Sequence, residues 1–341
     1  MKLRPLVLAG IVVASMSQVA LATDTQQQAP ITTTTTTQNQ AESTEQRIKR
    51  LSYTAQNQSE SAERRVDALH ELSQYPNQNA LVAVTRSLKD ANADIREAAI
   101  VGAKPYQIEY RWKLVSPLLS DPEKAVQVAA VVSLIPDFST MTKSQQEAIN
   151  KNYPTVIEFL SKQSGKRSQL LLADVYRWHK EWDKAEALYQ TLLADPSLST
   201  QVSLSLSDNY RAQSQDQRAL DVLNTAIEQN AKSGQLQYAK ALTLVRMDEK
   251  AQAAVAIEKA TTLSPSNSYY WYLNGVLQEP LDVEKATDSF EKAYLISGAP
   301  EQLYAVCDIY VRHDHPKADV CLEELGNVAP PYVIEQLKAQ N

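Results

Sequence analysis

A segment that recurs at a fixed interval decides the fold of this chain. Residues 173–192 read ADVYRWHKEWDKAEALYQTL, and residues 207–226, 34 positions later, read SDNYRAQSQDQRALDVLNTA. Both begin with a small residue, followed by a tyrosine three positions on and an alanine nine positions after that. A small residue lets two antiparallel helices approach closely, and a large residue four positions after the alanine (Tyr189, Leu223) fills the groove between them. Each segment therefore predicts a packed pair of helices.

The same pattern continues towards the C-terminus at intervals of 34, 34, 33 and 32 residues. The recurring alanines are Ala185, Ala219, Ala253, Ala286 and Ala318. The small positions twelve or eleven residues before them are Ala173, Ser207, Ala241, Gly275 and Cys307. These residues, over about residues 166–328, resemble about five tetratricopeptide repeats. The resemblance implies an all-α fold, a right-handed helical solenoid whose concave face is lined by the first helix of each repeat.

An earlier part of the chain repeats with a period of 31 residues. Residues 88–99, LKDANADIREAA, recur as residues 119–130, LSDPEKAVQVAA. The spacing of Asp94 and Glu97 predicts a capping box, and Asp121-Pro122 predicts an N-cap followed by proline at the first helical position. The segment, over about residues 60–136, resembles short HEAT-like repeats. We therefore expect HEAT-like helices over residues 47–136 and tetratricopeptide helices after them.

The segments beside the two arrays are assigned from their composition and from the positions of their prolines. Residues 137–165, with Pro154 inside them, are expected to form the junction helices between the two arrays. Pro330-Pro331 ends the last repeat, and residues 329–341 are expected to form the C-terminal capping helix that solenoids need at their ends.

The N-terminus predicts export. Lys2 and Arg4 precede an apolar run, and Ala20-Leu21-Ala22 supplies a cleavage site, so residues 1–22 are expected to be a signal peptide cleaved after Ala22. Residues 23–46, which include the six threonines of residues 32–37, are expected to be a disordered linker, with an O-glycosylated stalk as the alternative. No later segment is long and apolar enough to cross a membrane. The predicted location is the periplasm or the medium.

Composition excludes several classes of protein. The chain has only 7 glycines among 341 residues, about 2 % where about 7 % is usual. Because tight hairpins and phosphate-binding loops need glycine, this scarcity argues against β-barrels, dinucleotide folds and P-loops. A net charge of −6 gives no support to general nucleic-acid binding.

The sequence contains no motif for a nucleotide, a covalent haem or a catalytic triad, so we expect neither a cofactor nor an enzyme. His313-Asp314-His315 offers too few convergent ligands for a metal site and is expected to be a solvated turn.

The two cysteines of the chain, Cys307 and Cys321, fall on the two helices of the last repeat. Antiparallel helices can bring them within disulfide distance, and an oxidising compartment favours a structural bridge. The alternative is two buried free thiols.

The tetratricopeptide resemblance places a set of side chains on the concave groove. Tyrosine and arginine predominate among them, and these are the residue types enriched at binding hot spots. The expected partner-binding residues are Arg167, Asp174, Arg177, Asp208, Arg211, Tyr238, Arg246, Tyr269, Tyr272 and Tyr304. Leu170 and Asp308 take groove positions by the same register, whereas Tyr270 or Trp271 is expected to fill the core. Asp174 and Asp208 stand where repeats that clamp a chain terminus place asparagine, which disfavours a chaperone-tail adaptor.

Three functions are compatible with these features. The favoured one is an exported scaffold that binds a protein or peptide of the bacterial envelope in its concave groove. The second is an assembly or maturation factor for an envelope complex in secretion, cell-wall or respiratory-cytochrome biogenesis. The least favoured is an enzyme of lyase type, for which no nucleophile or acid–base pair can be named.

Overall fold

The computed structural model describes residues 42–339, which contain helices and turns and no strand, so the predicted all-α class is confirmed. The chain divides into two compact units, one ending at Ser168 and the other beginning at Gln169. The predicted signal peptide and most of the predicted linker lie outside the described residues.

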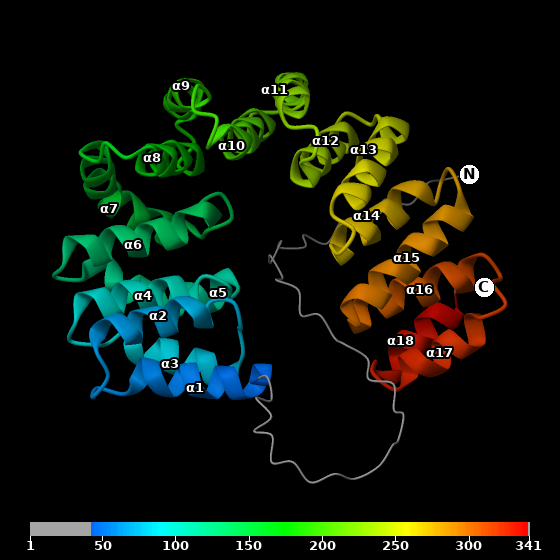
Figure 1. Cartoon of the computed structure of the whole chain (residues 1–341), viewed down its shortest axis with the longest axis horizontal. Helices are drawn as coiled ribbons and strands as arrows, with labels where there is room; N and C mark the ends of the chain where they lie inside the picture. Colours follow the sequence, from blue (N-terminus) through cyan, green and yellow to red (C-terminus); the bar gives the residue numbers. More distant parts are fainter. Residues whose placement is uncertain (1–41, 340–341) are drawn as a thin grey trace, which may run out of the picture. The chain divides into compact units, whose positions relative to one another are not determined.

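The first unit is built from seven α-helices joined by short turns. They are α1 (Thr44–Gln56), α2 (Ala62–Leu72), α3 (Gln78–Ser87), α4 (Ala93–Ala103), α5 (Ile108–Val115), α6 (Lys124–Leu134) and α7 (Lys143–Ser161). Short 3₁₀ turns follow α5 (Ser116–Ser120) and α6 (Ile135–Asp137). The helices α2, α4 and α6 begin at residues 62, 93 and 124, so the 31-residue period of the sequence is also the period of the structure. They pack in that order, α2 on α4 and α4 on α6 (Figure 1).

The linker was expected to extend to residue 46, and this boundary is wrong. The helix α1 begins at Thr44, because Ser43 and Gln46 form a reciprocal capping box at its N-terminus. Ile48 and Leu51 lie on the apolar face of α1 and are buried. This helix packs on α2 and α3. The cap and this apolar face are enough to order the segment.

Both predicted caps in the 31-residue repeats are also wrong. The N-cap of α4 is Asn92, whose side chain accepts a hydrogen bond from the backbone N–H of Asp94. Asp121 does not cap α6, which begins at Lys124. The Asp121 carboxylate is occupied by the guanidinium of Arg96 instead.

The junction segment forms one helix rather than several. The helix α7 runs through Pro154 without a break and begins with a capping box between Thr142 and Gln145. Ile149, Tyr153 and Val156 are buried, and α7 packs on α6. Tertiary packing on both sides of the proline therefore sustains the helix despite the missing N–H.

The second unit contains five helix pairs and a final helix. The first helices are α8 (Lys166–Trp178), α10 (Ser199–Ala212), α12 (Gly234–Arg246), α14 (Ser268–Gln278) and α16 (Pro300–Arg312). The second helices are α9 (Trp182–Leu192), α11 (Asp216–Gln229), α13 (Lys250–Leu263), α15 (Val283–Ser297) and α17 (Ala318–Gly326). The last helix, α18 (Pro331–Lys338), packs on α16 and α17.

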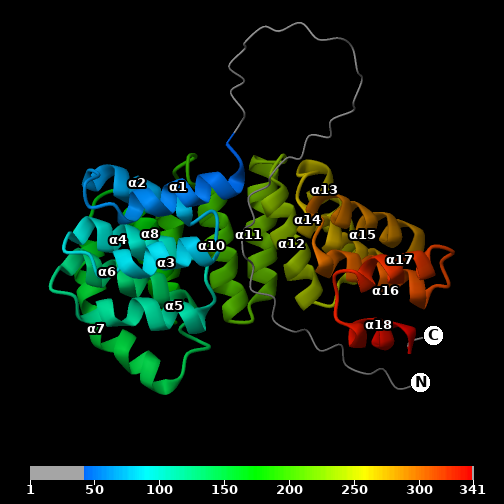
Figure 2. The same ribbon diagram turned by 90° about the horizontal axis from the view of Figure 1, so that it is seen from below.

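These five pairs match the five registers of the tetratricopeptide-like pattern. Within this unit α8, α10 and α12 lie on the inner side of the curve and α9, α11 and α13 on the outer side (Figure 1). Successive helices such as α10, α11 and α12 stand side by side (Figure 2).

The small positions of the pattern are contact points between helices, and all five are buried. Gly275 is the clearest case, since a Cβ atom there would lie 2.7 Å from the ring of Phe290. Phe290 is itself the large residue four positions after the repeated Ala286. The pattern therefore reports helix packing, as expected.

A left-handed residue recurs in the turn between the two helices of a pair. Lys180, Ser214, Asp248 and Asp314 have φ values of 68°, 59°, 61° and 51°. The first three are 34 residues apart, so the turn repeats with the helices. Because the chain has few glycines, non-glycine residues occupy these turn positions. Each of them carries the strain energy of a left-handed backbone conformation.

The two cysteines form a disulfide between α16 and α17, with a Cα–Cα distance of 5.4 Å. This excludes the alternative of two free thiols.

Within residues 42–339, no helix combines the length and apolarity that crossing a bilayer requires.

Candidate functional site

A continuous row of polar and aromatic side chains runs over the first helices of the second unit. We call this row the first-helix strip. Its members are Asp174, Arg177, Asp208, Arg211, Tyr238, Tyr269, Tyr272, Tyr304 and Asp308. It is charged near α8 and α10 and aromatic on α12, α14 and α16.

The charged end begins with a network around a buried tyrosine. The hydroxyl of Tyr189 donates to Asp174 Oδ1 at 2.6 Å, and Arg177 Nε donates to the same hydroxyl at 3.1 Å. Burial raises the pKa of Tyr189 above its usual value, so the phenol stays protonated. Tyr189, on α9, thereby fixes the orientation of two side chains on α8.

Arg177 then connects the first pair of helices to the second. Its guanidinium lies 4.0 Å from the carboxylate of Asp208 on α10, which also forms an ion pair with Arg211 one turn later. The backbone carbonyl of Arg211 accepts a hydrogen bond from Arg246 on α12 at 3.2 Å. The charges alternate in sign along this half of the strip and are held in place by one another.

The aromatic half is a set of rings in contact. Tyr238 on α12 meets the ring of Tyr269 on α14 edge-on, with centroids 6.1 Å apart. The rings of Tyr269 and Tyr272 stack with centroids 6.4 Å apart. The ring of Tyr272 is tilted against that of Phe290, with centroids 5.7 Å apart. Burial raises the pKa of Tyr238 and of Tyr272. These rings are half-buried, so each presents one part to solvent and anchors the other.

The far end of the strip carries a second charged cluster. Arg312 Nε donates to Asp308 Oδ2 at 2.8 Å, and its guanidinium also forms an ion pair with Glu279, the C-cap residue of α14. His313 Nε2 lies 3.0 Å from Glu279 Oε1, whereas His315 stacks on Tyr310 with centroids 4.0 Å apart. The two histidines thus point to different partners. No group of three or more His, Cys, Asp or Glu side chains in residues 42–339 is arranged to hold a metal ion.

The strip brings together most of the residues that the sequence placed in the groove. Arg246 lies beside it and is paired with Asp216 at 2.7 Å. Arg167 is exposed in the first turn of α8, before the boundary between the units at Ser168, so the strip does not include it. Leu170 is buried in the core, which makes its groove assignment wrong. Tyr270 is buried and stacks on Tyr238 at 5.0 Å, in agreement with a core role.

Two contributors were missed by the sequence reasoning. Tyr189 was identified only as the large residue of the repeat, and Glu279 was not singled out at all. The register marks the position of Tyr189, but the partner of its hydroxyl depends on the crossing of α8 and α9. The role of Glu279 depends on the approach of α16, 33 residues later in the sequence.

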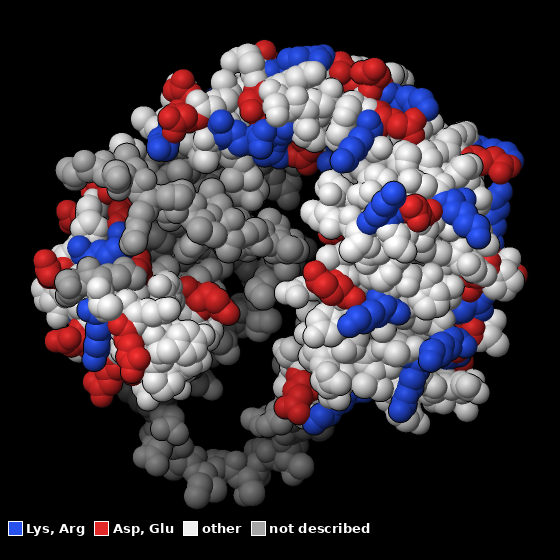
Figure 3. Space-filling view, turned by 180° about the vertical axis from the view of Figure 1, so that it is seen from behind, with Lys and Arg blue, Asp and Glu red and all other residues white. Residues whose placement is uncertain are grey.

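On the face drawn in Figure 3, acidic and basic side chains of the described residues are interspersed over the surface. That face therefore presents no extended field of one sign.

Comparison with known proteins finds no match among family models and none among curated proteins. Solved structures similar to part of the chain include a crystal structure of MamA, 19 % identical with a TM-score of 0.40, covering 50 % of this chain and 98 % of that one. Another is MamA from Desulfovibrio magneticus RS-1, at 14 % identity and a TM-score of 0.41, covering 49 % and 96 %. A third is YrrB, described as a TPR protein with an unusual peptide-binding site, at 16 % identity and a TM-score of 0.42, covering 52 % and 94 %. Similarity at these identities and TM-scores does not establish a function, so the function is inferred from the residues of this chain.

Proposed function

We propose that the second unit is a non-enzymatic scaffold that binds a segment of a protein partner along the first-helix strip. The observation that carries this proposal is that two sets of side chains in contact follow one another along the first helices: Asp174, Arg177, Asp208 and Arg211 on α8 and α10, and Tyr238, Tyr269 and Tyr272 on α12 and α14. One partner segment lying along the strip would meet side chains from several repeats at once.

The aromatic half supplies most of the expected affinity. Half-buried tyrosines bury a large area with few rotatable bonds, and each keeps a hydroxyl that can hydrogen-bond. Tyr238, Tyr269 and Tyr272 are already held by neighbouring rings. Binding a partner would therefore restrict these side chains little further, which lowers the entropic cost of association.

The charged half is suited to specificity. Arg177 and Arg211 are held by Asp174 and Asp208, so they are fixed donors rather than freely moving cations. Fixed charges of alternating sign select a partner with the complementary order and disfavour others.

The finer parts of the proposal rest on the sequence. The signal-like sequence of residues 1–22 supports a location in the periplasm or outside the cell, and the disulfide is compatible with an oxidising compartment. The partner would then be a protein or peptide of the bacterial envelope. The first unit would be a HEAT-like array joined to about five tetratricopeptide repeats, and an assembly factor for an envelope complex is the second candidate.

Site-specific photo-crosslinking in the native cell tests the proposal. The probe is placed at Tyr272 or Arg211 on the strip, and the control is Glu258, an exposed residue of the second helix α13. We expect a discrete adduct at the two strip positions and none at the control. Equal labelling at all three positions, or no adduct at the strip, would refute the assignment.

A double variant gives a quantitative second test. Tyr269→Ala with Tyr272→Ala removes two anchors, each expected to contribute at least about 1 kcal/mol, so affinity should fall by roughly tenfold or more. Val255→Ala, on the exposed face of α13, is the matched control and should leave binding unchanged.

A further inference from the structure

Three tyrosines of the first-helix strip differ from other rings of the second unit in their surroundings. Four of those other rings lie with their centroids between 4.0 and 5.5 Å from the charged group of a Lys or Arg, and they belong to Tyr176, Trp178, Tyr210 and Trp271. Among residues 42–339, no Lys or Arg takes such a position over Tyr238, Tyr269 or Tyr272. The face of an aromatic ring attracts a cation that lies within about 6 Å of its centroid. These three half-buried rings can therefore receive a cation from a partner.

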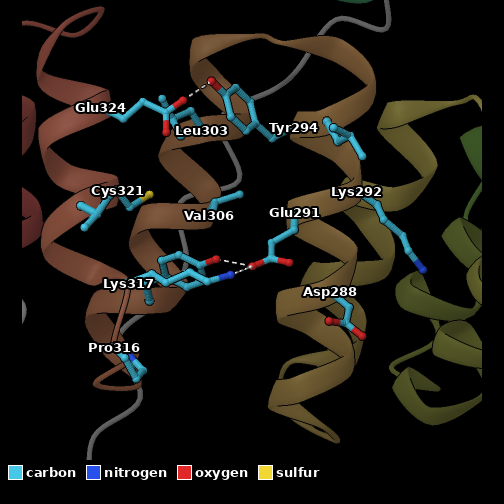
Figure 4. Close-up of a pocket in the computed structure, with 13 residues that line it drawn as sticks. Asp288, Glu291, Lys292, Tyr294, Leu303, Val306, Pro316, Lys317, Cys321 and Glu324 are labelled. Carbon is cyan, nitrogen blue, oxygen red and sulfur yellow. Dashed lines mark hydrogen bonds and ion pairs between the residues drawn. The ribbon is translucent and has the colours of Figure 1, made fainter. Parts of the chain in front are cut away.

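Two lysines next to this part of the strip are engaged elsewhere. Lys292 extends from α15 away from α16 and α17 (Figure 4), and its ammonium lies 4.5 Å from the centroid of the Trp271 ring. Lys317 points to Glu291, with 3.4 Å between the ammonium and the carboxylate (Figure 4). The second helices thus use these lysines for their own contacts and leave the tyrosines of the strip uncovered.

The first helices of the last two pairs, with their flanking turns, are acidic. Residues 264–282 and 298–316, which include α14 and α16, contain five Asp or Glu, one Arg and no Lys. The five carboxylates belong to Glu279, Asp282, Glu301, Asp308 and Asp314. The single Arg, Arg312, forms ion pairs with both Asp308 and Glu279. One positive charge is shared between two carboxylates, so the cluster keeps a negative charge although its members are paired.

This negative charge acts at the aromatic rings. Burial is the main cause of the raised pKa of Tyr272, and the charge of Asp308 raises it further. Arg211 and Arg246, on the preceding first helices, are each paired with an aspartate. A cation over the strip tyrosines would therefore be attracted both by the ring faces and by the carboxylates beyond them.

We infer that the partner segment bound by the strip is basic, with a Lys or Arg side chain lying over the tyrosines of α12 and α14 and facing Asp308 and Glu279. The inference rests on the function proposed for the strip, because it names the chemistry of the partner that binds there. Arginine suits both parts of the site, since its planar guanidinium stacks on aromatic rings and pairs with carboxylates. An acidic segment would be repelled by the same carboxylates.

Selection from a randomised peptide library tests the inference with the full chain that follows the predicted signal peptide. The library is selected in parallel on the wild type and on the double variant Tyr269→Ala with Tyr272→Ala. The double variant has the same charge as the wild type, so peptides held by charge alone bind to both. Among peptides that prefer the wild type, we expect Lys and Arg to be enriched at least about threefold over the library.

The outcomes of the selection separate this inference from the function on which it rests. If neutral or acidic peptides preferred the wild type, the basic partner would be overturned and the scaffold function would stand. If no peptide preferred the wild type, the strip would not bind peptides, and both proposals would be overturned.

Single substitutions then separate the ring from the charge, with the most enriched basic peptide as the probe. Tyr272→Leu removes the ring face and should raise the dissociation constant at least about threefold, whereas Tyr272→Phe keeps the face and should raise it less. Asp308→Asn removes a carboxylate and should also raise the dissociation constant about threefold. Melting temperatures are measured in parallel to exclude unfolding.

Asp221→Asn is the matched control for the charge change, because Asp221 is exposed on the second helix α11, away from the strip. It should leave the dissociation constant unchanged. Equal effects of Tyr272→Leu and Tyr272→Phe would overturn the contact between the cation and the ring. An Asp308→Asn variant that binds the peptide as well as Asp221→Asn would overturn the role of the carboxylates.

Discussion

Arg96 and Asp121 form a buried two-bond ion pair between successive repeats of the first unit. Arg96 Nε donates to Asp121 Oδ2 at 2.8 Å and Nη2 donates to Oδ1 at 2.7 Å. The residues are only 8 % and 6 % exposed. Arg65 and Asp90, each 31 residues earlier, form the equivalent pair. The 31-residue period thus repeats an ion pair as well as a helix.

Replacing Arg96 by methionine should destabilise the first unit by about 3–5 kcal/mol, because the buried Asp121 carboxylate loses its partner. Hydrogen exchange of the α4 amides measures the loss. The control is Lys162→Met, which breaks an exposed pair with Glu158 and should cost about 1 kcal/mol or less. Equal effects of the two substitutions would contradict the buried role of the Arg96 pair.

The same pair should make the first unit sensitive to acid. The hydrogen bond from Arg96 holds the pKa of Asp121 below its usual value. A carboxyl group whose pKa is lowered in the folded state contributes its full stabilisation above the unfolded pKa of about 4 and loses it as the pH falls through the folded pKa. The stability difference between the wild type and Arg96→Met should therefore shrink below about pH 4. Denaturant titrations at several pH values check this, and a difference that does not change with pH would refute it.

The left-handed turns predict opposite effects for two glycine substitutions. Ser214 has φ 59°, so Ser214→Gly should stabilise the second unit by about 0.5–1 kcal/mol, because glycine enters this region without strain. Gly298 has φ 60°, and a Cβ atom added there would meet no neighbour within 4 Å, so Gly298→Ala should destabilise by about 1 kcal/mol through backbone strain alone. Thermal melts of both variants test the pair. The same sign of change in both would contradict the backbone explanation.

Helix packing predicts that Gly275→Ala is destabilising although alanine is the better helix former. The new Cβ atom would lie 2.7 Å from the Phe290 ring, and relieving such overpacking costs about 1–3 kcal/mol. Gly326→Ala is the control, because no atom lies within 4 Å of its Cβ position, and helix propensity should then make it neutral or stabilising. Chemical denaturation of both variants measures the difference, and a stable Gly275→Ala protein would argue against close packing of α14 on α15.

Removing the disulfide should lower the stability of the second unit. Cys307 and Cys321 are 14 residues apart, and a closed loop of about 15 residues is worth about 3 kcal/mol of unfolded-state entropy. The variant Cys307→Ala with Cys321→Ala should melt at a lower temperature than the oxidised wild type. A reductant should lower the melting temperature of the wild type and leave that of the variant unchanged. A wild type unaffected by reduction would contradict a stabilising bridge.

The sequence predicted the helix pairs well because the same spacing of small and large residues occurs five times. A position that is ambiguous in one copy is therefore identified by the others. Five copies of one spacing identify the positions of Ala185 or Gly275 more securely than any single window could. The caps were predicted less well, since Asn92, Asp94 and Asp121 are all plausible caps by residue type. The Asp121 carboxylate pairs with Arg96 instead of capping α6, and that pair is a contact between repeats.

The candidate strip was predicted in part for the same reason. The register placed Arg177, Arg211, Tyr238 and Tyr269 on the first helices, because that requires only helical periodicity. It could not exclude Leu170, which lies one turn from Asp174 and turns into the core.

By itself, the sequence determined the all-α class, the two repeat periods and the helix on which each candidate residue lies. These features follow from the spacing of small and large residues along one helix, which is a local property. Only the tertiary structure decided that Tyr189 orients Asp174 and Arg177 and that Arg96 binds Asp121. Those relations join residues on different helices, and they depend on how closely and at what angle the helices cross.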